Sequence, residues 1–261
     1  VAILAANNEV WPIADVGALM AGAVSIGVYP TSAEVQVQEI LSDCNARVVV
    51  VDTTEQLDKV RAVRSELPNL RTVLSQADGS FDGWLARGVN AQARVGSDVQ
   101  LRIDDAAPDD VAILVYTSGS TGQPKGVGNT HAALAERLQW MQAAYGLDES
   151  DVLMQKAPIS FDVSVWECFW PLVTGSQLVL AGPGEHRDPH RIAQLVERFG
   201  VTTLHFVPPL LSLFVDEPLS ARCTSLRRIF SGGEALPAEL RNRVMAQLPA
   251  AQLHNRYGPT E

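Results

Sequence analysis

Short apolar runs alternate along the chain with longer segments whose apolar residues recur at helical spacing. In the first hundred residues this pattern predicts alternating strands and helices over 1–7, 9–23, 24–30, 32–44, 46–52, 55–67 and 71–74. Ser32 is the predicted N-cap of the helix that begins there. Such alternation is typical of a doubly wound, parallel α/β sheet.

The alternation resumes after residue 108. It predicts strands over 111–115, 152–157, 176–182, 202–208, 226–232 and 252–256. It predicts helices over 131–145, 162–172, 189–199 and 237–247. Residues 76–108 lose the periodicity and gain Gly, Asp and Ser, so we expect a linker or surface excursion there. The sequence therefore predicts a first α/β subdomain over 1–108, ending in this linker, and a second over 109–261.

Composition and charge restrict the possible partners. The formal net charge of −10 leaves no basic surplus to neutralise nucleic-acid phosphates or an anionic membrane surface. The sequence contains no apolar run of about 18 residues, the length that would predict a membrane span. Cys44, Cys168 and Cys223 lack metal-ligand spacing and suit a reducing, cytoplasmic setting. The chain begins without Met and ends in YGPTE, so we expect both ends to be cuts through a larger protein.

One polar segment carries candidate chemistry. Residues 116–126, YTSGSTGQPKG, lie between a predicted strand and a predicted helix. Their glycines allow backbone N–H groups to turn inward, and their hydroxyls and one lysine suit the β- and γ-phosphates of a nucleotide. The segment does not fit the Walker A pattern. On composition alone, an ordinary turn-rich connection explains it equally well.

Four motifs together resemble a known family. The segment YTSGSTGQPKG resembles the phosphate-binding signature of the adenylate-forming (AMP-binding) superfamily, which includes acyl-CoA synthetases, luciferases and the adenylation domains of nonribosomal peptide synthetases. FDVSVWE (161–167), SGGEALP (231–237) and NRYGPTE (255–261) resemble further motifs of the amino-acid adenylation domains, in the expected order. The resemblance implies a partial fragment of the large N-terminal domain, with parallel doubly wound sheets. The family's ribose-binding Asp and its small C-terminal domain would be absent, so we expect the fragment alone to be a poor catalyst.

The resemblance also implies roles in binding ATP. The residues that would hold the phosphates and the nucleotide are Thr117, Ser118, Gly119, Ser120, Thr121, Gly122, Lys125, Gly233, Glu234, Asn255, Tyr257, Gly258 and Thr260. The residues that would act in catalysis are Lys125, Thr260 and Glu261, with Glu261 on the Mg²⁺ side. Taken alone, YGPTE reads as a strand end followed by a Gly-Pro turn.

A further set of residues would line the substrate site. They are Asp162, Val163, Trp166, His205, Phe230, Gly232 and Arg256. By resemblance Asp162 would pair with a substrate α-ammonium group, and the alternative is a helix cap with Trp166 in the core. The first five resemble a serine-activating set, whereas Gly232 and Arg256 depart from it. The guanidinium would recognise an acidic or strongly polar side chain or turn to solvent, and His205 has the alternative of a hydrogen-bonded core histidine.

The function implied by the resemblance is ATP-dependent activation of a carboxylic acid, above all an α-amino acid, as its acyl-adenylate with release of pyrophosphate. The acyl group would pass to the phosphopantetheine thiol of a carrier-protein domain. Residues 9–52 instead resemble long-chain fatty acyl-CoA synthetases, so a fatty acyl-CoA or acyl-AMP ligase is an alternative. A degenerate, non-catalytic nucleotide-binding fragment is another.

Overall fold

The computed structural model describes residues 1–117, 124–256 and 258. The chain forms two compact units. The first unit consists of Val1–Arg137 with Pro158–Phe161, and the second of Leu138–Ala157 with Asp162–Glu261. The sequence placed a boundary after residue 108, but the residues that follow join the first unit because a strand there pairs with the first sheet.

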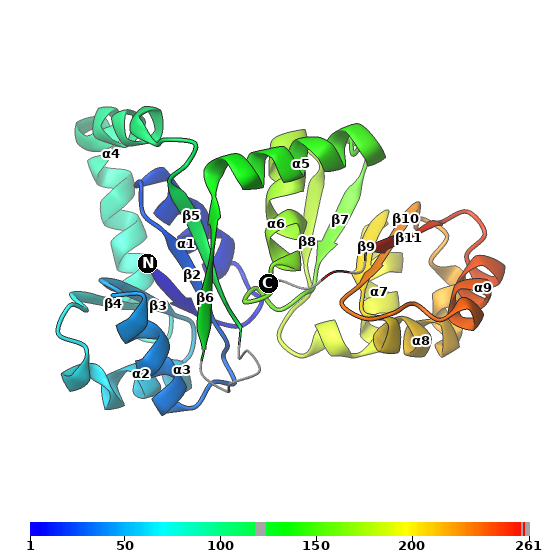
Figure 1. The fold of residues 1–261 in the computed structure, drawn as a ribbon, viewed down its shortest axis with the longest axis horizontal. Coiled ribbons are helices and arrows are strands. Elements are labelled where there is room, and N and C mark those ends of the chain that lie inside the picture. The colour runs from blue at the N-terminus through cyan, green and yellow to red at the C-terminus, as the bar shows by residue number, and fades with distance from the viewer. Residues whose placement is uncertain (118–123, 257, 259–261) are drawn as a thin grey trace. The chain divides into compact units, whose positions relative to one another are not determined.

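The first unit contains one sheet with the strand order β4-β3-β1-β2-β5-β6 (Figure 1). Its strands are β1 (Ala2–Leu4), β2 (Ser25–Val28), β3 (Val48–Val51), β4 (Thr72–Ser75), β5 (Val111–Thr117) and β6 (Lys125–Thr130). Neighbours pair in parallel, except for β5 and β6, which are antiparallel. Every residue of β1 and β2 is buried, as expected of strands covered on both faces.

Helices cover both faces of this sheet. They are α1 (Val10–Met20), α2 (Glu34–Asp43), α3 (Thr54–Ala62), the 3₁₀ turn η1 (Arg64–Glu66) and α4 (Ser80–Asp105). Apolar residues of α2 and α3 pack into one buried cluster with the strands, and those of α1 with Phe81 of α4 into another. The sheet is therefore the middle layer of three.

The start of α2 differs from the prediction. Ala33, not Ser32, occupies the N-cap, and its backbone N–H donates to Gln36 Oε1 at 3.0 Å. A side chain three residues into the helix thus satisfies this terminus. Helix α3 has a hydroxyl N-cap, because Thr53 Oγ1 accepts from the backbone N–H of Gln56.

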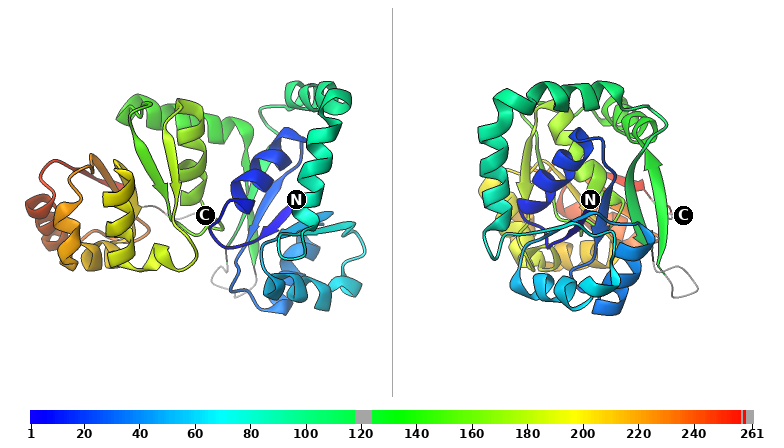
Figure 2. Two further views of the ribbon diagram at one scale, coloured as in Figure 1. Left: turned by 180° about the vertical axis from the view of Figure 1, so that it is seen from behind. Right: turned by 90° about the vertical axis from the view of Figure 1, so that its left-hand side faces the viewer.

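The predicted linker over 76–108 is wrong in its local structure, because most of it forms the 26-residue helix α4. This helix changes direction part-way along its length (Figure 2). Only Phe81 is fully buried, while Leu85, Val95 and Val99 are half-buried, so a weak apolar stripe holds the helix to the unit. Three glycines and many polar residues hide that stripe in the sequence. As predicted, the segment lies at the surface.

The second unit contains a fully parallel sheet with the order β11-β10-β9-β7-β8 (Figure 1). Its strands are β7 (Val152–Gln155), β8 (Gln177–Leu180), β9 (Thr203–Phe206), β10 (Arg228–Gly232) and β11 (Gln252–Arg256). Its helical segments are α5 (His131–Tyr145, which begins in the first unit), α6 (Val163–Thr174), η2 (Glu185–Arg187), α7 (Pro189–Phe199), α8 (Pro208–Asp216), η3 (Pro218–Arg222) and α9 (Ala238–Gln247). The parallel sheets confirm the predicted α/β class.

Two hydrophobic clusters lie on opposite faces of this second sheet. One contains apolar residues of α7, α8 and α9, and the other contains Trp166 and Trp170 of α6 with Met141 of α5. Strand β9 contributes Leu204 and Phe206 to the first of these clusters. Because side chains alternate along a strand, its other residues face α5 and α6.

Candidate functional site

The predicted substrate residues gather at the carboxyl ends of three neighbouring strands in the second unit. Phe230 lies opposite His205 in the β9–β10 register, and Gly232 lies opposite Arg256 in the β10–β11 register. In open α/β sheets, ligands bind beyond the carboxyl ends of the strands. The register therefore places these four positions where a ligand site is expected.

Helix α6 adds an aromatic wall to this cluster. The ring of Trp166 meets that of Phe230 edge-on at 5.3 Å and that of His205 at 6.0 Å. Val163, one turn earlier, packs against the same cluster. The structure thus brings together all the predicted substrate residues from Val163 to Arg256. Trp166 is 5% exposed, so it is also part of the core, as its alternative interpretation held.

The sequence left two orientations open for Arg256, and in the structure its guanidinium lies against three aromatic rings. Its guanidinium lies 4.7 Å from the ring centre of Trp140, 5.5 Å from that of Tyr145 and 5.7 Å from that of Phe230. A planar cation stacks favourably on aromatic faces. Arg256 is half-buried, and the three rings fix the position of its charge beside the cluster.

Gly232 is required by the close approach of two strands. A Cβ built at this position would lie 2.7 Å from the carbonyl oxygen of Arg256 and 3.3 Å from His205 Nε2. A backbone oxygen cannot yield as the end of a side chain can, so the strand ends would have to separate. This contact explains why Gly stands where the resemblance suggests Ser.

Asp162 precedes the first turn of α6. It occupies the N-cap with helical backbone angles, φ −56° and ψ −30°, and its carboxylate makes no capping hydrogen bond. A functioning acidic cap has extended angles and accepts from the N2 or N3 backbone N–H. The side chain is half-buried, so the geometry disfavours the helix-cap alternative.

The predicted phosphate loop connects two antiparallel strands. The expected plan of strand, loop and helix is wrong, because β6 precedes α5 and pairs with β5. Thr117 and Lys125 are cross-strand partners at the base of this hairpin, and Lys125 is exposed. Ser118, Gly119, Ser120, Thr121 and Gly122 lie outside the described residues.

A tyrosine anchors the base of the hairpin. Tyr116 donates a hydrogen bond of 2.6 Å from its hydroxyl to Asp43 Oδ2, and burial with this contact raises its pKa. Gly126 lies opposite Tyr116, and a Cβ on Gly126 would approach the ring to 3.1 Å. The glycine therefore permits the ring to lie across the hairpin, which positions the two ends of the loop.

The remaining nucleotide residues are only partly described. Gly233 has a φ of +84°, and Glu234, Asn255 and Gly258 are exposed. Tyr257, Thr260 and Glu261 lie outside the described residues. Over residues 1–117, 124–256 and 258, no group of three or more His, Cys, Asp or Glu side chains could hold a metal ion.

Sequence reasoning missed two buried ionisable side chains beside the cluster, one basic and one acidic. Lys156 follows β7 and is 4% exposed, and Glu167 of α6 is 0% exposed. Glu167 Oε2 accepts from the backbone N–H groups of Lys156 at 3.1 Å and Ala157 at 2.9 Å. Glu167 is the one charged residue in an apolar helix, VSVWECFWPLVT, which is a signal for a buried, partnered carboxylate.

Burial shifts the pKa values of this group. It raises the pKa of Glu167 to about 7, against the lowering influence of Lys156, and lowers the pKa of Lys156 to about 8, against the raising influence of Glu167. The pKa of His205 falls to about 3, chiefly through burial and then through the positive charges of Lys156 and Arg256. His205 is therefore neutral at physiological pH.

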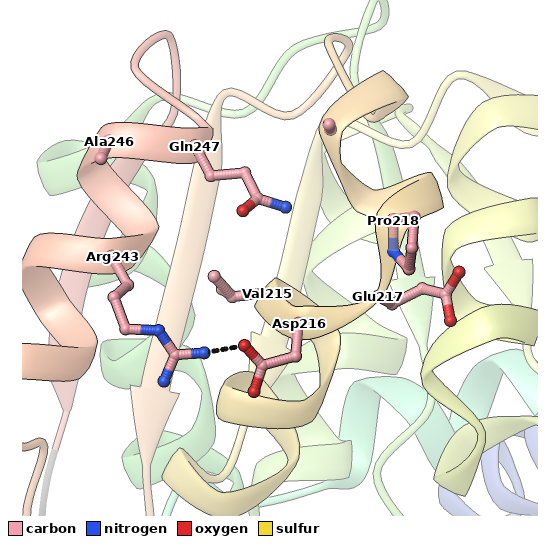
Figure 3. Close-up of a pocket in the computed structure, with 8 residues that line it drawn as sticks. Val215, Asp216, Glu217, Pro218, Arg243, Ala246 and Gln247 are labelled. Atoms are coloured by element: carbon pink, nitrogen blue, oxygen red, sulfur yellow. Dashed lines mark hydrogen bonds and ion pairs between the residues drawn. The ribbon is translucent and has the colours of Figure 1, made fainter.

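A groove of about 620 Å³ lies elsewhere in the second unit, between α8, η3 and α9 (Figure 3). Arg243 pairs there with Asp216 and donates to Ser212 Oγ at 3.3 Å. The groove lies on the helices that cover the other face of the sheet, and it contains none of the predicted site residues.

The chain belongs to the AMP-binding enzyme family, whose model matches residues 1–261. The predicted relationship to the adenylate-forming superfamily is thereby confirmed. Over 158 residues, or 59% of the chain, it is 52% identical to enterobactin synthase component F of Escherichia coli (strain K12), of which the match covers 12%. Over 245 residues, or 93% of the chain, it is 38% identical to tyrocidine synthase 3 of Brevibacillus parabrevis, of which the match covers 3%. The chain thus spans only a small part of these relatives.

Solved structures share the fold. The anthranilate CoA ligase AuaEII, in complex with anthranoyl-AMP, superposes with a TM-score of 0.83 at 25% identity, covering 100% of this chain and 49% of that one. The nonribosomal peptide synthetase FmoA3 superposes with a TM-score of 0.78 at 25% identity, covering 100% of this chain and 26% of that one. No helix within the described residues is long and apolar enough to cross a membrane.

Proposed function

We propose that the protein carrying this chain activates a carboxylic acid with ATP, forming an acyl-adenylate and releasing pyrophosphate. Membership of the AMP-binding enzyme family supports the reaction class. The observation that carries the proposal is the cluster at the carboxyl ends of β9, β10 and β11, which joins Trp166, His205 and Arg256 at one place.

The chain's residues have two tasks in this proposal. The hairpin of β5 and β6 presents Thr117 and Lys125 on either side of the loop that would hold the β- and γ-phosphates. The lysine charge would stabilise the negative charge of departing pyrophosphate. The cluster in the second unit would hold the acid and orient its carboxylate toward the α-phosphate.

The proposed acid is an α-amino acid. The carboxylate of Asp162 makes no capping hydrogen bond, and a half-buried carboxylate is well matched to a substrate ammonium group. The likeness to tyrocidine synthase 3 and enterobactin synthase component F supports a place within a nonribosomal peptide synthetase. In that setting the acyl group would pass to a carrier-protein phosphopantetheine thiol.

Magnesium belongs to the same proposal. Glu261 and Thr260 would act on the Mg²⁺ and α-phosphate side, with Tyr257 against adenine. A hard divalent cation would be bound through one carboxylate and the phosphates of ATP.

An acid without an α-ammonium group is the second candidate. The likeness to the anthranilate CoA ligase AuaEII and the fatty acyl-CoA synthetase character of residues 9–52 favour it. Asp162 discriminates the two, because a carboxylate next to an uncharged substrate would lose solvation without gaining a partner.

ATP–pyrophosphate exchange on the full-length protein tests the proposal. The panel contains the proteinogenic amino acids, polar non-proteinogenic ones, anthranilate and a long-chain fatty acid. Exchange with one amino acid is the expected result. Exchange only with an acid that lacks the amine would transfer the function to the second candidate, and ATP binding without any exchange would indicate a degenerate site.

A further inference from the structure

A buried carboxylate faces one of the proposed substrate residues. Glu167 lies immediately after Trp166 on α6 and is fully buried. One of its oxygens, Oε2, is held by the backbone N–H groups of Lys156 and Ala157. These two donors fix which oxygen points toward the backbone and which points away from it.

The second oxygen of Glu167 points toward His205. Oε1 lies 4.0 Å from His205 Nδ1 and accepts no hydrogen bond from any residue that the structure describes. At this separation the interaction is electrostatic rather than a hydrogen bond. A carboxylate beside an imidazole nitrogen favours a proton on that nitrogen.

His205 can respond to that influence through its tautomer alone. The ring is neutral, because burial and the positive charges of Lys156 and Arg256 disfavour the imidazolium form. A neutral imidazole has one N–H, so a proton on Nδ1 makes Nε2 a hydrogen-bond acceptor. Nε2 lies beside Gly232, 3.3 Å from where a Cβ would stand, at the carboxyl end of β10.

We propose that Glu167 is a positioning residue that holds His205 in the Nδ1-protonated tautomer, so that Nε2 offers an acceptor to the substrate side chain. The inference rests on the proposed function, since it assigns the ligand of the same cluster. The side chain selected would carry a hydrogen-bond donor, such as a hydroxyl. A site built to receive a donor rejects an isostere that lacks one, because its own polar atom would lose a partner on binding.

The variant Glu167→Gln removes the negative charge that acts on His205 and keeps nearly the same side-chain shape. Its carbonyl oxygen can still accept from the N–H groups of Lys156 and Ala157, as Oε2 does. The amide NH₂ then occupies the place of Oε1, 4.0 Å from His205 Nδ1, and turns its partly positive hydrogens toward the ring. These hydrogens disfavour a proton on Nδ1 electrostatically, so the proton is expected on Nε2.

The tautomer is measured first, in the wild-type protein. Long-range ¹H–¹⁵N correlation spectra of histidine-labelled protein at about pH 8, above the pKa of about 7 for Glu167, report which ring nitrogen carries the proton. The variant His205→Gln assigns the signal. Protonation at Nδ1 is expected in the wild type and at Nε2 in Glu167→Gln. Protonation at Nε2 in the wild type would overturn the inference without any need for a folded variant.

Substrate selectivity is measured second, by pyrophosphate exchange with serine and with 2-aminobutyrate, in which a methyl group replaces the hydroxyl. The wild type is expected to favour serine by at least about tenfold in kcat/KM, and Glu167→Gln to lose most of that preference through KM. The matched control is Glu197→Gln, which removes an exposed carboxylate paired with Arg222 and should keep the preference. An unchanged preference in Glu167→Gln would contradict the proposed role.

The two measurements separate this inference from the proposed function. If the wild-type protein exchanges with no acid, the proposed function fails, and the wild-type tautomer alone then decides whether Glu167 positions His205. If exchange occurs but serine is not favoured over 2-aminobutyrate, the acceptor role of Nε2 is wrong while the activity stands.

Discussion

At the scale of single residues, the second unit buries two ionisable side chains, and burying either in its charged form costs free energy. Lys156 is 4% exposed and Glu167 is 0% exposed, and burial moves the pKa values of both side chains toward neutral pH. Glu167 also accepts from two backbone N–H groups and faces His205, which gives its burial a role beyond stability.

Lys125 is the residue whose removal should separate activity from folding. It is exposed at the start of β6. We expect Lys125→Ala to slow pyrophosphate exchange about tenfold or more, because a charge-assisted contact to phosphate is lost, while the free energy of unfolding changes by less than about 0.5 kcal/mol. Exchange assays and urea unfolding measure the two effects.

Lys59→Ala is the matched control. This lysine donates to the carbonyl oxygen of Pro30 at 2.8 Å and pairs with Glu55, so its loss should lower stability and leave exchange intact. A large loss of stability in Lys125→Ala with unchanged exchange would contradict the phosphate role.

At the scale of elements, hydrophobic periodicity predicted the helices and strands whose bounds depend on local sequence. The bounds of α7 and β11 agree with the prediction to the residue, and α7 has a strong apolar pattern with a clear start and stop. Helix α7 begins at an Asp188 cap followed by proline and ends at Gly200 with a φ of +65°. These are local signals that a sequence displays directly.

Other elements depend on tertiary pairing and were missed. Strand β6, KGVGNT, has two glycines and one apolar residue, and it is a strand because β5 pairs with it. The site has the same limitation, since His205, Phe230 and Arg256 come from three strands whose register is not visible in the sequence. Only the resemblance grouped them, and the contact between Glu167 and His205 had no sequence signal of its own.

The stability of helix α4, which the sequence pattern did not predict, can be tested directly. Gly88 is exposed within it, and a Cβ there would meet no atom within 4 Å. We expect Gly88→Ala to raise the free energy of unfolding by about 0.5–1 kcal/mol, because alanine loses less backbone entropy in a helix. Urea unfolding measures this gain.

The control for α4 is Gly79→Ala at the N-cap. Gly79 has a φ of +74°, which alanine adopts only with strain, so this variant should be less stable than the wild type. A loss of stability in Gly88→Ala as well would contradict a regular helix at that position.

At the scale of the whole molecule, stability depends on pH through buried carboxylates. Asp15 of α1 is 6% exposed, and burial raises its pKa to about 6, against the lowering influence of the nearby Ser25. Its folded-state pKa thus lies above the unfolded value of 3.8. The folded state then binds more protons than the unfolded one between about pH 4 and 6, so the wild type loses stability as pH rises through that window.

Asp15→Asn removes this loss. At about pH 8 we expect the variant to be more stable than the wild type by on the order of 2 kcal/mol, and at about pH 4 the difference should nearly vanish. Chemical unfolding at both pH values measures the change. An equal effect at the two pH values would show that the charge of Asp15 is not its origin.

The measurement that bears most directly on the proposed function is the effect of Asp162→Ala on discrimination for the α-amine. Pyrophosphate exchange by the full-length protein is compared for the preferred amino acid and for the same acid without its amine. The wild type should favour the amino acid, and the variant should reduce that ratio by about a hundredfold, as expected for loss of a charged partner. An unchanged ratio would contradict an amino-acid site at the start of α6 and return Asp162 to a purely structural role.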